Sequence, residues 1–246
     1  MSTIENHAAV TVSLNCSDAK SAALTYAIDS EPSNGTLATI NQANGQVAYT
    51  PAGGFSGVDT FTYHAISANG VAESQTVSIS VRPVVAVLTP ANGAFTNKAT
   101  PVFSGTASTG EEDADSVTVT VVSGPALSGT LVTSLQASVA PNGAWSVSPT
   151  GPLANGTYTV SAKISDAAGL KGMSAANTFT VDTVAPAVSI TTPASCSSST
   201  NASPTFSGKA ANGAVDLPAV TVDVYTGIGT SGTPVQKLTA TESGGA

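Results

Sequence analysis

Apolar side chains alternate with Thr, Ser or Lys in short runs along the chain, as in residues 10–14 and 117–121. This period of two is typical of antiparallel strands that bury one face. Further runs of this kind are Leu24/Tyr26/Ile28, Phe61/Tyr63/Ala65, Val77/Ile79/Val81, Trp145/Val147, Tyr158/Val160/Ala162/Ile164 and Phe179/Val181. No stretch keeps a helical period over three turns. The pattern therefore predicts an all-β fold.

Turn residues separate these runs. Asn-Gly pairs begin at Asn34, Asn44, Asn142 and Asn155. The Asn-Gly dipeptide favours the positive φ angles of tight hairpin turns. The sequence thus predicts antiparallel hairpins, and short strands bounded by such turns are typical of β-sandwiches.

An internal repeat appears when the chain is shifted by 103 positions, which aligns residues 87–143 with residues 190–246 without a gap and gives 22 identities in 57 columns. Pro101-Val102-Phe103-Ser104-Gly105, for example, falls on Pro204-Thr205-Phe206-Ser207-Gly208. Self-similarity of this kind is the signature of tandem domains.

Three domains follow from the repeat and from the prolines at its borders: 1–83, 84–183 and 184–246. The last has no counterpart of Tyr158–Ser165 or Asn177–Asp182, so we expect an incomplete and less stable sandwich with open edges. We also expect both ends of the chain to be cut, because the start carries no signal peptide and the end reads Glu-Ser-Gly-Gly-Ala.

The composition of the chain excludes several kinds of binding partner. Charged residues are 9% of the 246, the net charge is −8, and Arg82 is the one arginine beside six lysines. Phosphate backbones and anionic lipids are bound by clustered Lys and Arg, so neither nucleic acid nor a membrane surface is an expected partner. No apolar run reaches the 18 residues that span a bilayer. The two cysteines, Cys16 and Cys196, lie in different predicted domains, so no disulfide is expected within either.

Residues 3–81 resemble the cadherin-like repeats of large bacterial surface proteins. The motifs that carry the resemblance are Glu5-Asn6, Leu24-Thr25-Tyr26, Pro32-Ser33-Asn34-Gly35-Thr36-Leu37, Tyr49-Thr50-Pro51 and Phe55-Ser56-Gly57-Val58-Asp59-Thr60-Phe61-Thr62-Tyr63. The turn at residues 17–21 departs from the family, because it keeps one acidic residue and adds a lysine. We also expect the domain to lack the customary first strand of such a repeat.

Residues 87–186 resemble a bacterial immunoglobulin-like repeat of giant adhesins. The matching motifs are Pro90-Ala91-Asn92-Gly93, Pro101–Ala107, Asn142–Ser146, Leu153–Tyr158, Ser165–Gly169 and Val181–Pro186. The resemblance implies seven-stranded sandwiches in an elongated array on the cell surface or in a secreted protein. Neighbouring repeats, and a cell-surface glycan or protein, are the partners that it implies.

Calcium is the one cofactor that the sequence suggests. Asp166, in a strand-end turn, and Asp182, at a domain junction, are candidate ligands, because related adhesin repeats hold Ca²⁺ between neighbours. In the first domain Glu5, Asp18 and Asp59 are weaker candidates. The acidic run at residues 111–115 also offers carboxylates, but a solvated loop before the next strand is the favoured interpretation.

Other motifs favour structural roles. Residues 227–232 spell G-x-G-x-x-G, but no helix is expected after them, so a strand-connecting loop is favoured over a nucleotide site. His7 and His64 have no partner at metal or catalytic spacing in the sequence. Trp145 alternates in phase with Val147, which favours a core position over a sugar-stacking one.

The sequence therefore predicts no enzyme. The main hypothesis is a structural spacer of a bacterial adhesin-like surface or secreted protein. The alternative is an accessory array that binds or positions polymer for a secreted carbohydrate-active enzyme.

Overall fold

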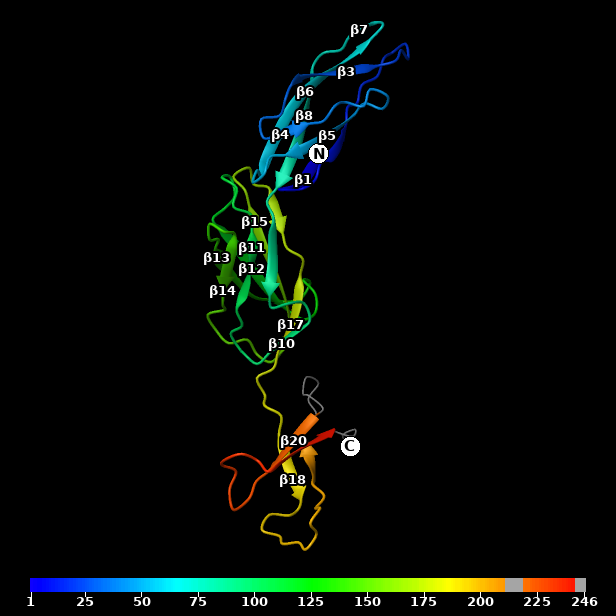
Figure 1. The fold of residues 1–246 in the computed structure, drawn as a ribbon. Coiled ribbons are helices and arrows are strands. Elements are labelled where there is room, and N and C mark those ends of the chain that lie inside the picture. The colour runs from blue at the N-terminus through cyan, green and yellow to red at the C-terminus, as the bar shows by residue number, and fades with distance from the viewer. Residues whose placement is uncertain (211–218, 242–246) are drawn as a thin grey trace. The chain divides into compact units, whose positions relative to one another are not determined.

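The structure of the chain is a computed structural model that describes residues 1–210 and 219–241 (Figure 1). All regular elements in the described part are β-strands, which confirms the all-β prediction. The chain forms two compact units, Met1–Val181 and Asp182–Ala246. The first unit contains two β-sandwich domains, and each unit is described by itself.

The first domain pairs a sheet in the order β1-β8-β6-β3, with β7 attached to β6, against a second sheet in the order β2-β5-β4. Its core packs aromatic and branched side chains from both sheets, with Tyr49, Phe61 and Ile79 fully buried. The strands are β1 (Ser2–Ile4), β2 (Val10–Ser13), β3 (Thr25–Ser30), β4 (Gly35–Leu37), β5 (Gln46–Pro51), β6 (Gly57–Ser67), β7 (Gly70–Val71) and β8 (Gln75–Arg82).

The second domain begins two residues after β8. One sheet has the order β14-β11-β9, and the other has the order β10-β17-β15-β12-β13, with β16 paired to β15. The strands are β9 (Val85–Thr89), β10 (Ala94–Thr96), β11 (Phe103–Ala107), β12 (Ser116–Ser123), β13 (Leu131–Ser138), β14 (Ala144–Val147), β15 (Gly156–Ser165), β16 (Lys171–Met173) and β17 (Asn177–Val181). In both domains a short early strand runs parallel to the last strand: β1 along β8, and β10 along β17.

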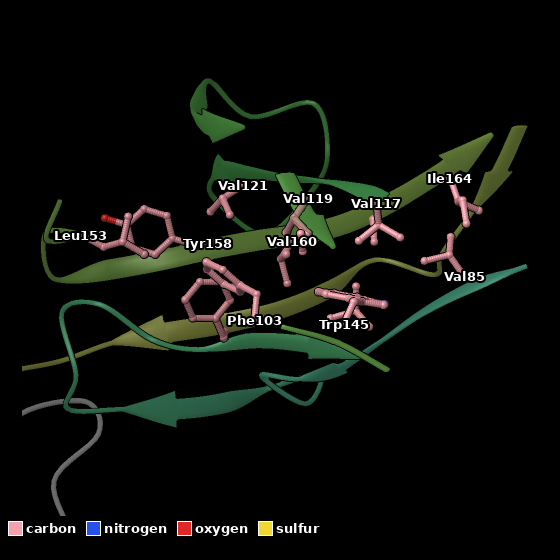
Figure 2. Packing of buried hydrophobic residues seen from close by; sticks show 14 of the residues in the cluster. Val85, Phe103, Val117, Val119, Val121, Trp145, Leu153, Tyr158, Val160 and Ile164 are labelled. Carbon is pink, nitrogen blue, oxygen red and sulfur yellow. The ribbon is translucent and has the colours of Figure 1, made fainter. Parts of the chain in front are cut away.

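The second domain has the larger core, which lies between its two sheets (Figure 2). Trp145 is 3% exposed and lies among these buried side chains, so its predicted core position is confirmed. The ring of Phe179 stacks on Tyr158 at 5.6 Å between centroids and meets Phe103 edge-on at 5.7 Å. Gly105 is required at the register shift between the paired strands β11 and β9, because a Cβ there would lie 1.8 Å from the carbonyl oxygen of Ala86.

The second unit contains two hairpins among its described residues. β18 (Val188–Thr192) pairs with β19 (Ser207–Ala210), and β20 (Ala219–Val224) pairs with β21 (Gln236–Thr241). Each strand lies 103 positions after its counterpart among β9, β11, β12 and β13, to within a few residues at the ends. No hydrophobic side chain of the described part of this unit is fully buried, and Val188 and Ile190 are more than 60% exposed.

Candidate functional site

The junction between the two domains of the first unit is built by close backbone contacts. A Cβ on Gly110 would lie 2.2 Å from the carbonyl oxygen of Gly54, and one on Gly172 would lie 2.0 Å from that of Pro83. Real Cβ atoms do not approach backbone oxygens so closely, so both positions need glycine. The turn around Gly54 and the loop around Gly110 also line an open groove.

A hydrogen bond joins the two domains beside these contacts. The hydroxyl of Ser56, which is 1% exposed, donates to Oδ1 of Asp113 at 2.5 Å. The backbone N–H of Gly110 donates to Oδ2 of Asp113 at 2.8 Å. Asp113 belongs to the acidic run that the sequence analysis assigned to a solvated loop. Glu111 and Glu112 are exposed as expected, but Asp113 is half-buried and bound to the first domain.

Glu5 lies at the same junction and is 4% exposed. Its Oε1 accepts a hydrogen bond from Nδ2 of Asn6 at 3.1 Å, whereas its buried Oε2 has no donor. Burial raises the pKa of the Glu5 carboxyl, the negative charge of Asp113 raises it further, and the Ser108 hydroxyl counteracts part of this effect. Glu5 is therefore a buried acid next to a second acid.

Asp166 faces the same loop from the turn after β15 and is 7% exposed. It pairs with Asp113 in an isolated β-bridge, and its Oδ1 accepts the N–H of Leu170 at 2.7 Å. Its Oδ2 is buried and has no hydrogen-bond donor. Glu5 and Asp113 thus lie close together at the junction, and Asp166 pairs with Asp113 through the backbone.

Asp182 lies at the other end of the second domain. Gly156, at the start of β15, pairs with Val181, whereas Asp166 follows the end of β15. The ten residues of β15 span about 30 Å. Asp166 and Asp182 therefore do not form one site, because a strand runs from one end of a sandwich to the other. Oδ1 of Asp182 accepts the N–H of Val184 at 3.0 Å.

Glu5, Asp18 and Asp59 do not come together either. Asp59, 2% exposed, lies near the start of β6, where it accepts hydrogen bonds from the N–H groups of Ser33 and Asn34 and from the hydroxyl of Tyr49. Burial, together with the charge of Asp59, raises the pKa of Tyr49.

Asp18 contacts the opposite end of β6. It accepts hydrogen bonds from Ser67 and Asn69, which lower its pKa to about 2, with help from the N–H groups of Ala22 and Lys20. These donors occupy both carboxylate oxygens of Asp18 and hold the loop after β2 in place. Donors likewise surround Asp59, and both residues have the geometry of loop-holding groups.

His64 has a partner that the sequence analysis missed. Its Nδ1 lies 2.5 Å from Oδ1 of Asp29, whose Oδ2 accepts the hydroxyl of Ser74 at 2.6 Å. The pairing of β3 with β6 brings these residues together across 35 positions of sequence, which no local spacing reveals. The order Ser–Asp–His places the carboxylate in the middle, so the histidine is not placed to activate the serine as a nucleophile.

The remaining motif lies in a loop. After β20 the chain passes through residues 227–232 to β21 with no helix, which confirms the loop interpretation. Within residues 1–210 and 219–241 there is no group of three or more His, Cys, Asp or Glu side chains arranged to hold one metal ion. The same residues form no helix of the length and apolarity that crossing a membrane requires.

Comparison with known families agrees with this architecture. Residues 1–83 match the family model of the bacterial cadherin-like domain, and residues 89–183 match that of the bacterial Ig-like domain. The chain therefore carries a bacterial cadherin-like domain followed by a bacterial Ig-like domain, in the order that the sequence resemblance implied. No curated protein matches the chain.

Solved structures with similar folds include fibronectin(III)-like modules of Clostridium thermocellum CbhA, at 15% identity and a TM-score of 0.32, over 72% of this chain and 86% of that one. A tetra-tandem repeat from the extending region of a large adhesion protein is 21% identical with a TM-score of 0.33, over 90% of this chain and 66% of that one.

Proposed function

We propose that this region is a non-catalytic spacer of a large bacterial adhesin-like protein, exposed on the cell surface or secreted. Both domain types that the family models identify are typical of extracellular structural modules. In this role the direct partners are the neighbouring repeats of the same chain, and any glycan or protein target is bound elsewhere in the molecule.

The observation that carries the proposal is the close-packed junction of the first unit. Only Pro83 and Val84 separate β8 from β9, and Pro83 has a fixed φ. Contacts on two sides of this connection, at Gly110 and at Gly172, leave no room for a side chain. A short connection with tight contacts on two sides resists bending, and a spacer needs that resistance to hold a distant domain away from the cell.

Double electron–electron resonance, which measures the distance between two spin labels, tests the stiffness of the junction. Spin labels are placed at Ser78→Cys and Ser134→Cys, exposed positions on the two domains, after Cys16 and Cys196 are changed to serine. We expect a narrow distance distribution in chelator as well as in calcium. Gly110→Val is expected to broaden or shift it, because the added methyls collide with the Gly54 carbonyl.

Gly151→Val is the matched control, since nothing lies within 4 Å of a Cβ at Gly151. A distribution that is already broad without either valine contradicts the spacer proposal. Binding of soluble polysaccharides to the unlabelled chain, with an affinity that Gly110→Val leaves unchanged, would instead favour the accessory-array alternative.

A further inference from the structure

We propose that the second domain contains a mechanical clamp, formed where residues 85–96 of β9 and β10 are bonded to β17, which tension along the chain loads in shear. Its use in the cell rests on the proposed spacer function, because a spacer transmits the pull between the cell and a target. The strength of the clamp is a property of this domain alone, and it is measured separately from the stiffness of the junction.

The directions of the strands determine how tension acts on this domain. β9 begins at the junction, directly after Pro83 and Val84, and runs away from it. β15 ends beside the junction at Ser165, so its antiparallel neighbour β17 also runs away from the junction. β10 is parallel to β17 and lies beside it (Figure 1). A pull on the two ends of the domain therefore draws β9 and β10 one way and β17 the other, along their lengths.

Shear loads the bonds of a strand pair together, whereas peeling loads them one after another. The bonds of a parallel ladder are spaced evenly along its strands, so a pull along the strands stretches all of them at once. A pull that opens the ladder from one end places the full force on the outermost bond. The parallel pairs β1–β8 and β10–β17 each join the start of a domain to its last strand, which is the position where tension acts in shear.

Side-chain and turn hydrogen bonds reinforce the pairing of β10 with β17. Oδ1 of Asn92, just before β10, accepts both the N–H and the hydroxyl of Thr178 at 2.9 Å. The N–H of Gly93 donates to the carbonyl oxygen of Thr178 at 2.7 Å. These bonds extend the contact with β17 beyond the three residue pairs of the ladder.

Asn177, at the start of β17, ties β9 to the same strand. Its Nδ2 donates to the carbonyl oxygen of Val87 at 3.2 Å and to that of Pro90 at 3.0 Å. The side chain of Asn177 is half-buried, so water has limited access to these bonds. β9 and β10 must therefore slide past β17 as one segment, and all of these bonds resist the movement together.

Single-molecule force spectroscopy of the whole chain tests the clamp through the direction of the pull. Handles are attached to pairs of cysteines at exposed positions, after Cys16 and Cys196 are changed to serine. Ser78→Cys with Val184→Cys stretches the second domain from end to end and loads the clamp in shear. Lys98→Cys with Val184→Cys pulls on β10 and β17 from the same end and peels them apart. Because forced unfolding reports the barrier to unfolding, we expect a severalfold higher unfolding force in shear than in peeling.

Asn92→Ala separates the clamp from general stability. It removes both bonds to Thr178, so we expect a lower unfolding force in shear and an unchanged force in peeling. Asn142→Ala is the matched control, since Oδ1 of Asn142 likewise accepts a backbone N–H, that of Ala144 at 3.1 Å, in a hairpin turn outside the loaded segments. The control should melt at a lower temperature than the wild type but keep its unfolding force in shear, because a bond that is still intact in the transition state does not change the unfolding rate.

Equal unfolding forces in the two directions of pull, measured without Asn92→Ala or Asn142→Ala, overturn the proposal even if one of these variants fails to fold. An equal loss of shear force in Asn92→Ala and Asn142→Ala overturns it as well. The spin-label distances test the spacer function separately. A broad distance distribution with direction-dependent forces contradicts only the stiff junction, and a narrow distribution with equal forces contradicts only the clamp.

Discussion

The two repeats, residues 84–183 and 184–246, share strands and register in their described parts but differ in burial. Val119 pairs with Leu135 in β12 and β13, and Val222 pairs with Leu238 in β20 and β21, at the same positions of the alignment. Val119 is fully buried, whereas Val222 is only partly buried.

The strands that cover the core account for this difference. In the first repeat β15 pairs with the edge of β12 that β13 does not occupy, and β14 pairs with β11. The described residues of the second unit include no counterpart of β14, β15 or β17. Hairpin sequence is therefore enough to set pairing and register, but the burial that stabilises a sandwich comes from strands distant in the chain.

The largest expected effect is on amide hydrogen exchange. Amides of β12 should exchange only through global unfolding of their domain, whereas those of β20 should exchange through local opening at a far lower free energy. We expect a difference on the order of 5 kcal/mol in the free energy of opening. Mass spectrometry or NMR of the intact chain measures it. Equal protection of the two strands would show that the second unit is stabilised in a way that its burial does not reveal.

The second largest expected effect is the loss of stability caused by Trp145→Ala. The substitution removes the largest side chain from the core of the second domain and leaves a cavity, which costs about 3–5 kcal/mol. The thermal transition of the first unit should fall or disappear while the signals of β20 and β21 stay unchanged. An intact melting transition together with altered polysaccharide binding in this variant would contradict the core assignment and indicate a binding role for Trp145.

A matched pair of valines sharpens the comparison further. Val119→Ala removes two methyl groups from a fully buried position and should destabilise its domain by about 2 kcal/mol. Val222→Ala, at the aligned position, should cost much less, because part of that side chain is already in water. Urea denaturation, monitored by NMR, measures the stability loss of each substitution separately. Similar losses from both substitutions would contradict the burial difference.

The smallest expected effect is the pH dependence of the first unit in chelator. Because the pKa of Glu5 is raised in the folded junction, folded protein binds this proton more tightly than unfolded protein does. The stability from protonated Glu5 is thus present at low pH and is lost as the pH rises through the raised pKa. Glu5→Gln, which mimics the protonated form, should flatten the melting-temperature profile at pH values above 4.5, the ordinary pKa of the glutamate carboxyl. Asp182→Asn is the control, and parallel profiles for wild type and Glu5→Gln would contradict a buried acid at this junction.

Local pattern predicted most of the fold. Alternation placed the strands, and the 103-residue shift located the four strands of the second unit. The Asn-Gly pairs at Asn44 and Asn142 lie in hairpin turns as predicted. Those at Asn34 and Asn155 do not, because each lies between strands of different sheets. The sequence also assigned Trp145 to the core and residues 227–232 to a loop. These features depend on contacts between neighbours in sequence, or on a period of two that any half-buried strand obeys.

The candidate site was predictable only in part. Glu5 and Asp166 stood among the candidate ligands, but each was grouped with the wrong partners, and Asp113 was assigned to a solvated loop. Ser56 carried no signal beyond its place in the cadherin-like motif. Its bond to Asp113 spans 57 positions and two domains, so no spacing rule could have found it.

The sequence by itself determined that the chain is all-β, where its strands pair locally and which domain families it contains. The tertiary structure alone decided which acids meet, because strand length carries Asp166 and Asp182 to opposite ends of one sandwich while the domain junction brings Glu5 to Asp113. It also decided which of two nearly identical valine strands is buried. Alternation specifies which face of a strand is apolar, but only strands arriving from elsewhere in the chain can cover that face and exclude water from it.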